Sequence, residues 1–376
     1  MAHVVVVGGG VMGSAAAWEL ASRGFAVTLL ERFAPGHTEG SSHGSSRIFR
    51  LAYADPFYVS LAARALPLWR QVEEESGQAV LELTGAVDHG PPEAIDALYA
   101  ELRIAGHAAR VLTPEQAGER WPGLRFDSSV LFHAAAGRVH ADRAVTAFQQ
   151  AAAARGTVVR HGVRVEKLLR HGTDRVEVVT ADGEVLSADA AVVAVGGWAP
   201  GLAAQTVAGI PPLRVTQEQP VHFPARPTAP DALVWPSFIH HPGARLTDPA
   251  GVYGLGSADG VKIGFHAVGP TVDPDRRDRS IDPAALRRVQ DYAEQWLPGV
   301  DSTAPTATTC LYTITPDHDF VVDRDGPVTV LAGFSGHGFK FAPAIGALAA
   351  ELVTGAPGAR RFALGRERTP GEGTEL

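Results

Sequence analysis

The first thirty residues alternate between apolar runs and a helical pattern, which predicts a strand, a helix and a second strand. Val4 to Val7 is a short, fully apolar run of the kind found in central parallel strands. The segment SAAAWELASRG predicts a helix with Gly24 as its stop signal. The run AVTLLE then predicts a second strand, which ends at Glu31. This order of elements is typical of a parallel βαβ unit.

The same kind of pattern returns further along the chain. The segment ADRAVTAFQQAAAARG predicts a helix that ends at Gly156, and Ala191 to Gly197 reads as another buried parallel strand. The run VTVLAG at 328–333 predicts a final strand, and APAIGALAAELVTG predicts a helix with Gly355 as its C-cap. Between these pieces, the region from 214 to about 310 is rich in predicted strands.

Gly8, Gly10 and Gly13 form a G-x-G-x-x-G motif between the first strand and the helix, which is the setting that dinucleotide binding requires. The first glycine permits a tight turn, the second lets a pyrophosphate approach the backbone, and the third lets the helix pack on the strand. The helix N-terminus offers N–H groups and a positive dipole end to the phosphates. Glu31 is suited to accept hydrogen bonds from the adenosine ribose. The context favours dinucleotide binding over a plain βα turn.

The motif does not separate NAD from FAD. The chain shows no second G-x-G-x-x-G between a strand and a helix, whereas an enzyme that reduces its flavin with NAD(P)H by this architecture would usually show two. If the cofactor is FAD, we therefore expect electrons to enter from a substrate and to leave to oxygen or a carrier.

The nucleotide-binding pattern lies in three separated pieces. We predict an α/β protein in which a Rossmann-type domain is interleaved with a second, substrate-binding domain that contains an antiparallel sheet. The Rossmann-type domain is predicted to comprise 1–82, 141–213 and 314–365, and the substrate domain to comprise 83–140 and 214–313. Residues 366–376 form a polar tail that we expect to fray.

Composition and charge narrow the function classes. Hydrophobic residues make up 45% of the chain and charged residues 20%, as in ordinary soluble globular proteins. The formal net charge is -8 and Lys and Arg form no dense run, which argues against a nucleic acid or an anionic membrane surface as partner. The apolar region 190–213 is broken by Gly, Pro and Gln, so it would not span a bilayer as one helix. The N-terminus lacks a basic leader and a cleavage site, and we expect a cytoplasmic protein.

Cys310 is the single cysteine among 376 residues. One thiol cannot form an internal disulfide, so the sequence does not imply an oxidising compartment. The thiol is either a small buried hydrophobe, a catalytic nucleophile or a point of covalent attachment, and the stretch around it leaves all three open. The chain contains no HExxH motif and no paired His/Cys spacing, so we predict no metal site.

Arg47, Arg50 and Lys262 can each be interpreted either as functional residues or as ordinary surface residues. The polar segment 33–53 is long for a loop inside a compact domain, and it contains Arg47 and Arg50. Lys262 lies in GVKIGFH, where strand alternation puts its apolar neighbours on one face and the lysine on the other. A solvated loop, a surface ion pair and a solvent-facing lysine are the alternative interpretations.

Four segments carry a resemblance to a known family. HGSSRIFRLAY (43–53), VKIGFH (261–266), CLYTITPDHDFVVD (310–323) and GFSGHGFKF (333–341) resemble monomeric sarcosine oxidase and its relatives, N-methyltryptophan oxidase and pipecolate oxidase. The resemblance covers nearly the whole chain in order and spacing. It implies that the Rossmann-type domain binds FAD and that Cys310 carries the 8α-methyl group of FAD through a thioether. A thiolate is a nucleophile suited to that attachment.

The resemblance also implies a set of site residues. Arg50 and Lys340 would bind the substrate carboxylate, and Tyr253 would contact the substrate. The predicted catalytic residues are Lys262, Arg47, His43, His266 and Tyr312. The residues predicted to contact the cofactor are Gly8, Gly10, Val11, Met12, Gly13, Glu31, Arg32, Ser42, His43, Arg47, Val165, Gly196, Cys310, Gly336, Gly338, Phe339 and Lys340.

Two segments carry expectations about shape. Gly333, Gly336 and Gly338 are expected to let backbone approach the flat flavin ring, and the helix that follows points its positive end there. The region 214–260 departs from the pattern of the sarcosine enzymes, and its segment LVWPSFIHH (233–241) is expected to line a larger pocket.

The function implied is an FAD-dependent oxidase of a secondary or cyclic α-amino acid, which gives an imine and hydrogen peroxide. We expect a monomer whose partners are a small amino acid and oxygen. The rival readings are a flavin-dependent dehydrogenase that passes electrons to a carrier, a nicotinamide-dependent dehydrogenase and a non-catalytic dinucleotide-binding protein.

Overall fold

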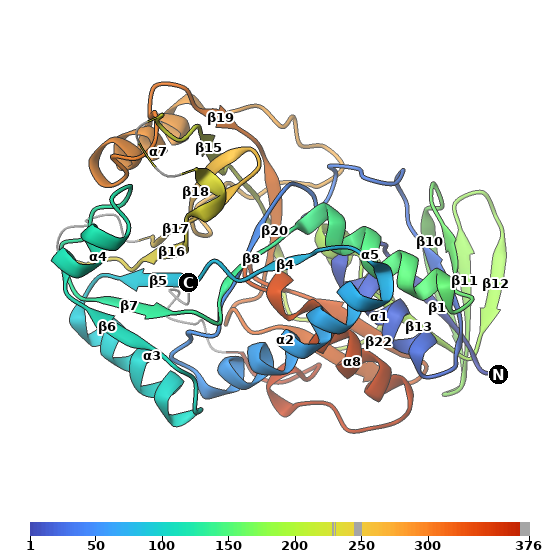
Figure 1. The fold of residues 1–376 in the computed structure, drawn as a ribbon. Helices are drawn as coiled ribbons and strands as arrows, with labels where there is room; N and C mark the ends of the chain where they lie inside the picture. Colours follow the sequence, from blue (N-terminus) through green and yellow to red (C-terminus); the bar gives the residue numbers. More distant parts are fainter. Residues whose placement is uncertain (228, 230, 244–249, 369–376) are drawn as a thin grey trace.

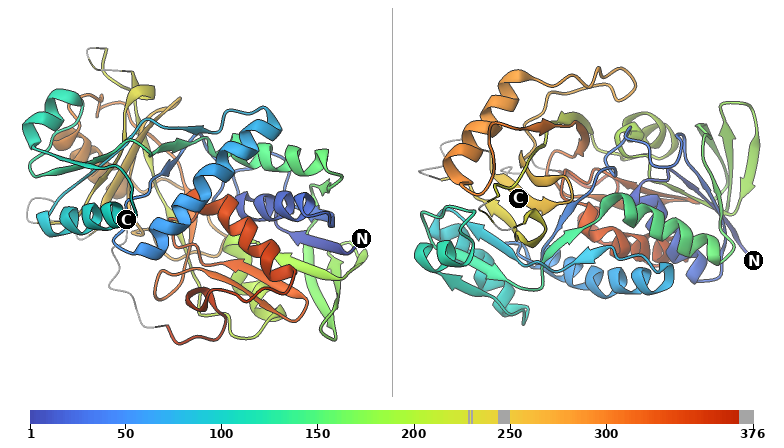
Figure 2. Two further views of the ribbon diagram at one scale, coloured as in Figure 1. Left: turned by 60° about the horizontal axis from the view of Figure 1, so that its bottom comes forward. Right: turned by 45° about the horizontal axis from the view of Figure 1, so that its top comes forward.

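The computed structural model describes residues 1–227, 229, 231–243 and 250–368. Figure 1 shows two adjoining parts, one around strand β1 (His3–Val7) and one around strand β5 (Ala86–His89). The two further views in Figure 2 show the same two parts side by side. Among the described residues, no helix combines the length and apolar character needed to cross a membrane.

A six-stranded sheet contains the predicted βαβ unit, in the order β21-β22-β13-β1-β2-β9. Its other strands are β2 (Ala26–Leu30), β9 (Val158–Arg160), β13 (Ala190–Val193), β21 (Val321–Asp325) and β22 (Val328–Ala332). The strands from β22 to β9 pair in parallel, and β21 is an antiparallel edge strand. Val4, Val5 and Val6 are completely buried at the centre, as expected of a strand covered on both faces.

Helices cover one face of this sheet. They are α1 (Val11–Ser22), α5 (Ala141–Ala154) and α8 (Ala342–Val353), with α2 (Pro56–Ser76) packed along α5 and α8 (Figure 1). Small residues let α8 approach α1 closely, since a Cβ at Gly346 would lie 2.6 Å from the Ala15 carbonyl oxygen. The other face is covered by α6 (Ala199–Thr206) and by a three-stranded antiparallel sheet of β10 (Val165–His171), β11 (Arg175–Thr180) and β12 (Val185–Ala188).

The second large sheet has eight strands in the order β19-β15-β18-β17-β16-β5-β7-β6. The strands are β6 (Arg110–Leu112), β7 (Val130–His133), β15 (Val221–Phe223), β16 (Ser237–His240), β17 (Val252–Ser257), β18 (Gly260–Phe265) and β19 (Thr306–Ala307), besides β5. All of its pairs are antiparallel except the parallel pair of β16 and β5. Helices α3 (Pro92–Ile104), α4 (Pro114–Arg120) and α7 (Pro283–Trp296) accompany it.

Helix α7 lies inside the region from 214 to about 310, which contains strands as predicted but for which no helix was predicted. The Asp282 carboxylate caps the helix by accepting from the Ala284 N–H at 2.8 Å, and Pro283 occupies the first helical position. One face of the helix packs into the core of the eight-stranded sheet. That face repeats at helical spacing, with Val289, Tyr292, Ala293 and Trp296 buried.

Two smaller ladders lie between the large sheets. One joins β3 (Arg47–Phe49), β8 (Gly137–Val139) and β4 (Leu81–Glu82), and the other joins β14 (Arg214–Glu218) and β20 (Cys310–Ile314). Both ladders are antiparallel. The remaining elements are the 3₁₀ turns η1 (Gly196–Trp198), η2 (Ala232–Val234), η3 (Phe339–Phe341) and η4 (Arg360–Phe362).

The interleaved α/β architecture agrees with the predicted fold class. The six-stranded sheet draws on residues 3–30, 158–193 and 321–332, and the eight-stranded sheet on residues 86–133 and 221–307. The domain boundaries themselves stay a prediction.

The predicted polar tail lies outside the described residues from 369 onward. The expectation that the first residues of this tail fray is wrong. Arg368 donates to Asp317 at 2.8 Å and its side chain is 4% exposed, while Arg366 pairs with Asp317 and, at 3.2 Å, with Asp319. These ion pairs hold residues 366–368 against the loop that follows β20.

Candidate active site

A single pocket brings together most of the residues that the sequence singled out. It is lined by the turn between β1 and α1, by the segment 40–50, by β10, β17 and β20, and by the loop from Gly333 to Lys340. The predicted site residues in the lining are Gly8, Gly10, Val11, Met12, Glu31, Arg32, Ser42, Arg47, Arg50, Val165, Gly196, Tyr253, Lys262, His266, Cys310, Tyr312, Gly336, Gly338, Phe339 and Lys340. His43 and Gly13 are not in the lining.

The glycine motif forms the tight turn between β1 and α1 that the sequence predicted. Gly8 has φ +103°, and a Cβ there would lie 2.4 Å from the Ala194 carbonyl oxygen. A Cβ at Gly13 would lie 1.9 Å from the Gly8 carbonyl oxygen, so this glycine allows the helix to pack on the strand, and it lies outside the pocket lining. Val11 N–H donates to Ser42 Oγ at 3.0 Å, and Gly9 N–H donates to Glu31 Oε2 at 2.6 Å.

Arg32, Trp198 and Asp275 form an aromatic and ionic cluster in the lining of the pocket. The Arg32 guanidinium pairs with Asp275 at 2.7 Å and lies 5.5 Å from the Trp198 ring centroid. Trp198 Nε1 donates to Asp275 at 2.9 Å. Sequence reasoning missed Trp198 and Asp275. Trp198 directly follows the glycine pair after β13, which was a usable signal, whereas Asp275 comes from a loop with no pattern of its own.

Two buried cations occupy another part of the pocket. Arg50 is 2% exposed, and its Nη1 donates to Asp88 at 3.0 Å. Arg50 Nη2 is buried and has no hydrogen-bond partner within the described residues. Lys340 Nζ donates at 2.8 Å to both Tyr53 Oη and the His337 carbonyl oxygen. Burial, with Arg50 nearby, holds the pKa of Lys340 well below its usual value, so its ammonium form requires a nearby anion to be stable.

Asp88 positions Arg50 and was not predicted from the sequence. It is fully buried, and its Oδ1 also accepts from His241 Nε2 at 3.0 Å. Burial alone would raise the pKa of Asp88, but Arg50 and His241 outweigh it and lower the pKa. The carboxylate therefore stays ionised and fixes one edge of the Arg50 guanidinium, which leaves the opposite edge for a ligand.

Lys262 points into the pocket, as strand alternation predicted. Val261 and Ile263 lie in the core of the eight-stranded sheet, whereas Lys262 lines the pocket and is 7% exposed. Lys262 Nζ donates to the Ser46 carbonyl oxygen at 3.4 Å. Burial, helped by Arg47, lowers the pKa of Lys262 to about 7. The interpretation as an ordinary solvent-facing lysine is wrong.

Arg47 and His43 organise the segment beside Lys262. The Arg47 guanidinium donates at 2.8 Å to the carbonyl oxygens of Ser41, His43 and Ser46. His43 therefore contacts Arg47 through its backbone carbonyl oxygen. Burial and the neighbouring cations lower the pKa of the His43 imidazole to about 3, so it is neutral at pH 7.

Cys310 is buried at the start of β20 and lines the same pocket. Burial raises the pKa of its thiol, while Arg47 and Lys262 act in the opposite direction. The cations that oppose burial therefore favour the thiolate at this position more than an apolar site would.

Two aromatic side chains and a histidine stand beside Cys310. Tyr253 and Tyr312 are joined by a side-chain hydrogen bond, and the ring centroids of Tyr312 and His266 lie 5.5 Å apart. Burial lowers the pKa of His266 to about 3, and its Nε2 is buried without a hydrogen-bond partner among the residues described. A neutral imidazole nitrogen is therefore available to a ligand.

The structure bears on two expectations about shape. A Cβ at Gly336 would lie 2.2 Å from the Tyr312 ring, so this pocket-lining glycine also makes room for the tyrosine. In the segment 233–241, Trp235 packs against Gly123 and Gly299 in the core. Ile239 is the residue of that segment that reaches the lining.

Comparison with known proteins identifies the family. A family model described as "DAO: FAD dependent oxidoreductase" matches residues 3–352. The chain belongs to the FAD-dependent oxidoreductases. The family resemblance predicted from the sequence is thereby confirmed, since monomeric sarcosine oxidase of Streptomyces avermitilis is 35% identical over 366 residues, covering 93% of this chain and 93% of that protein.

Solved structures agree with this assignment. NikD, described as an unusual amino acid oxidase essential for nikkomycin biosynthesis, has a TM-score of 0.81 and 25% identity and covers 97% of this chain and 98% of its own. L-proline dehydrogenase from P. horikoshii has a TM-score of 0.79 and 26% identity, with 94% and 93% covered. This FAD-dependent oxidoreductase therefore has the fold of amino acid-oxidising relatives.

The residues of this FAD-dependent oxidoreductase fit the family's cofactor. The glycine turn and the N-terminus of α1 would hold the phosphates, and Glu31 would face the ribose, at one end of the pocket. Cys310 and Lys262 line the same pocket. One cavity therefore contains groups suited to the phosphates of FAD and groups suited to its redox ring.

Proposed function

We propose that this protein is an FAD-dependent oxidase that converts a secondary or cyclic α-amino acid into an imine and produces hydrogen peroxide. The observation that carries the proposal is the buried pair Arg50 and Lys340 in the pocket that also holds the glycine turn. Asp88 already pairs with Arg50, whereas Lys340 Nζ donates to the neutral oxygens of Tyr53 and His337, so a second anion would stabilise the two cations together. A substrate carboxylate supplies that anion, and the relatives named sarcosine oxidase and amino acid oxidase support an amino acid.

The two cations have different parts in binding. Arg50 Nη2 lacks a partner in the described part of the chain, and Asp88 already fixes the other side of the guanidinium. The planar fork is suited to one carboxylate oxygen or both. Lys340 adds a compact charge, held by Tyr53 Oη and the His337 carbonyl oxygen. The α-carbon next to the carboxylate is then presented to the Cys310 end of the pocket.

The lining favours a neutral substrate amine. Its acidic residues are Glu31, Glu166 and Asp275, which come from segments around the nucleotide end. An ammonium group next to Arg50 and Lys340 would lack a carboxylate of the described lining as partner, whereas a neutral amine can contact the unpartnered Nε2 of His266. Bound FAD accepts the two electrons of the substrate and passes them to oxygen.

An oxygen-electrode screen of the holoenzyme tests the proposal. The panel contains N-methyl amino acids, proline, pipecolate and tetrahydropyridine carboxylates, each beside the amine that lacks the carboxylate. We expect oxygen uptake and peroxide formation with at least one carboxylated member and much less with its decarboxylated counterpart. Equal rates with both members of every pair would contradict carboxylate docking.

The similarity to L-proline dehydrogenase favours a second candidate, in which the electrons pass to a carrier. The same panel distinguishes it. Reduction of an artificial electron acceptor under nitrogen, without oxygen uptake in air, would identify a dehydrogenase and overturn the oxidase assignment.

We further propose that FAD is attached covalently to Cys310. The support is the position of the single cysteine in the pocket lining, with Arg47 and Lys262 acting to favour its thiolate. Formation of the thioether removes one hydrogen from the thiol and one from the methyl group, and oxygen takes up the two electrons.

The attachment predicts that acid-precipitated protein keeps its yellow colour. We expect the pellet of the wild type to be yellow and the pellet of a Cys310→Ser variant to be colourless, with any flavin of the variant in the supernatant. Absorbance of both fractions measures this. Wild-type flavin recovered entirely in the supernatant would contradict the covalent bond.

Three finer expectations belong to the same proposal. We propose that the enzyme acts as a monomer, which agrees with the name of its sarcosine oxidase relative, and that it works in the cytoplasm, which suits a chain with one cysteine. We also propose that its FAD-binding and substrate domains have the boundaries predicted from the sequence.

A further inference from the structure

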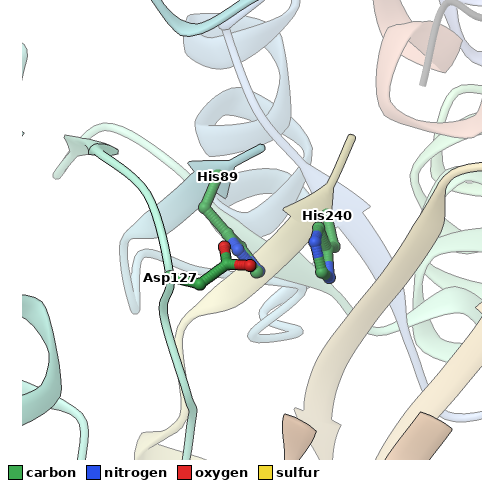
Figure 3. A group of neighbouring side chains, drawn as sticks. All are labelled: His89, Asp127 and His240. Carbon is green, nitrogen blue, oxygen red and sulfur yellow. The ribbon is translucent and has the colours of Figure 1, made fainter. Parts of the chain in front are cut away.

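His89, Asp127 and His240 form a cluster at the ends of two neighbouring strands of the eight-stranded sheet (Figure 3). His89 ends β5, His240 ends β16, and the two residues are paired in register across these parallel strands. Side chains alternate along a strand, and the preceding residues, Asp88 and Ile239, face Arg50 and the pocket. The two histidines therefore share the opposite face.

The donor atoms of the three side chains converge. One ligand atom from each residue lies within 4.8 Å of those from the other two. The rings of His89 and His240 are stacked with centroids 4.0 Å apart. Figure 3 shows the Asp127 carboxylate next to the His89 ring, on the chain segment that passes in front of both strands. Two imidazoles and one carboxylate are a donor set that suits Zn²⁺ and similar divalent transition metals.

The surroundings of the histidines resemble a metal site without its ion. His89 and His240 are each 2% exposed, and His89 Nδ1 is buried without a hydrogen-bond partner among the described residues. His240 Nδ1 lies 3.1 Å from Tyr292 Oη. When Nδ1 donates its hydrogen to this oxygen, Nε2 carries the lone pair that a metal requires.

The cluster also has an entry path. Asp127 is half-buried and lines a surface hollow together with Phe126 and Trp296. The rings of Phe126 and Trp296 lie edge-on to His89 and His240, at 5.2 and 4.5 Å. Gly90 N–H donates to Ser128 Oγ at 3.1 Å, which ties the segment that carries Asp127 to the strand that carries His89.

We propose that His89, His240 and Asp127 bind one divalent transition-metal ion of the Zn²⁺ type, with the fourth position open to the surface hollow. Tetrahedral donors at about 2.1 Å from zinc lie roughly 3.4 Å apart. The donor atoms therefore have to approach one another by at most about 1.4 Å, which rotation of the imidazoles about their soft χ2 torsions allows. The prediction of no metal site rested on local spacing, and these ligands are far apart in the sequence.

The ion would act as a cross-link in the substrate-binding part of the protein. It joins β5, β16 and the segment before β7, and the residue next to His89 is Asp88, which holds Arg50. Because the cluster and the pocket lie on opposite faces of the sheet, the ion would not contact the substrate. It would stabilise the strand ends that position Asp88 and Ile239.

Zn²⁺ binding to the holoenzyme tests this inference. Chelator-treated holoenzyme is dialysed against Zn²⁺ alone, and bound metal and melting temperature are measured. We expect one Zn²⁺ per chain and a higher melting temperature for the wild type. Asp127→Asn, a change at a half-buried side chain, is expected to weaken binding at least about tenfold without altering the flavin spectrum.

A matched control uses another histidine that lies beside a carboxylate. His171 Nε2 is 3.1 Å from Glu177 on the exposed surface, and His171→Ala is expected to bind Zn²⁺ as the wild type does. His240→Gln provides a second test of the cluster, with loss of binding expected. Binding below one equivalent in the wild type, or equal affinity in Asp127→Asn and the wild type, would overturn the inference.

Discussion

Replacing Arg50 by alanine is expected to weaken binding of a substrate-like carboxylate by about one to two decades. A desolvated, charge-assisted contact of this kind contributes about 1.5–3 kcal/mol. The ligand for the measurement is an unreactive analogue such as tetrahydrofuran-2-carboxylate, in which oxygen replaces the amine. Its dissociation constant is obtained by titrating the flavin absorbance of the holoenzyme.

Two controls separate loss of the contact from general damage. The amide of the same analogue lacks the charge, so its affinity should change much less between the wild type and Arg50→Ala. Arg138 is a second buried arginine, paired with Glu82 outside the pocket lining, and Arg138→Ala should leave carboxylate affinity nearly unchanged. If Arg50→Ala bound the carboxylate as the wild type does, the assignment of Arg50 would be wrong.

Replacing Lys262 by methionine is expected to slow the reaction of the reduced enzyme with oxygen by at least about two decades, the scale of losing one preorganised electrostatic contact. Negative charge develops on oxygen when it takes up the first electron, and Lys262 is a compact buried cation in the same pocket as Cys310. Methionine keeps most of the volume and removes the charge. Anaerobic reduction by substrate should change little, and stopped-flow absorbance measures both half-reactions.

The pH dependence gives the same prediction a second readout. The pKa of Lys262 is lowered to about 7, so the ammonium form is present below this pH and is lost as the pH rises through it. Reoxidation of the wild type should therefore slow as the pH increases across 7, whereas Lys262→Met should lack this step.

Lys340→Met is the matched control for Lys262. Both lysines are buried in the pocket, but Lys340 lies beside Arg50, so its loss should weaken substrate binding and spare reoxidation. Equal slowing of both half-reactions in Lys262→Met, or normal reoxidation, would show that Lys262 is not the oxygen-activating residue.

The sequence predicted those parts of the molecule that depend on local pattern. Gly8 and Gly13 could be recognised because a strand, a tight turn and a helix follow one another within a few residues, and the structure shows the contacts that exclude a side chain at both. The orientation of Lys262 followed from simple alternation along β18. The family resemblance then named Arg50, Lys340 and Cys310, which the fold brings into one pocket.

What the sequence did not predict depends on contacts between distant segments. Asp88 lies in a short buried strand and its partner Arg50 comes from another segment, so neither pattern nor spacing links them. Asp275 and the cluster of His89, Asp127 and His240 likewise depend on contacts between segments that are far apart in the sequence. Helix α7 is a different case, because its helical repeat was present in the sequence and was hidden by the strands on both sides.

The most direct test of the central claim is anaerobic mixing of the holoenzyme with the best amino acid from the oxygen-electrode screen. The account predicts that the oxidised flavin absorbance is lost under nitrogen and returns when air is admitted, with one hydrogen peroxide formed per flavin. A flavin that stays oxidised with every carboxylated secondary amine, yet is reduced by NADH, would contradict it.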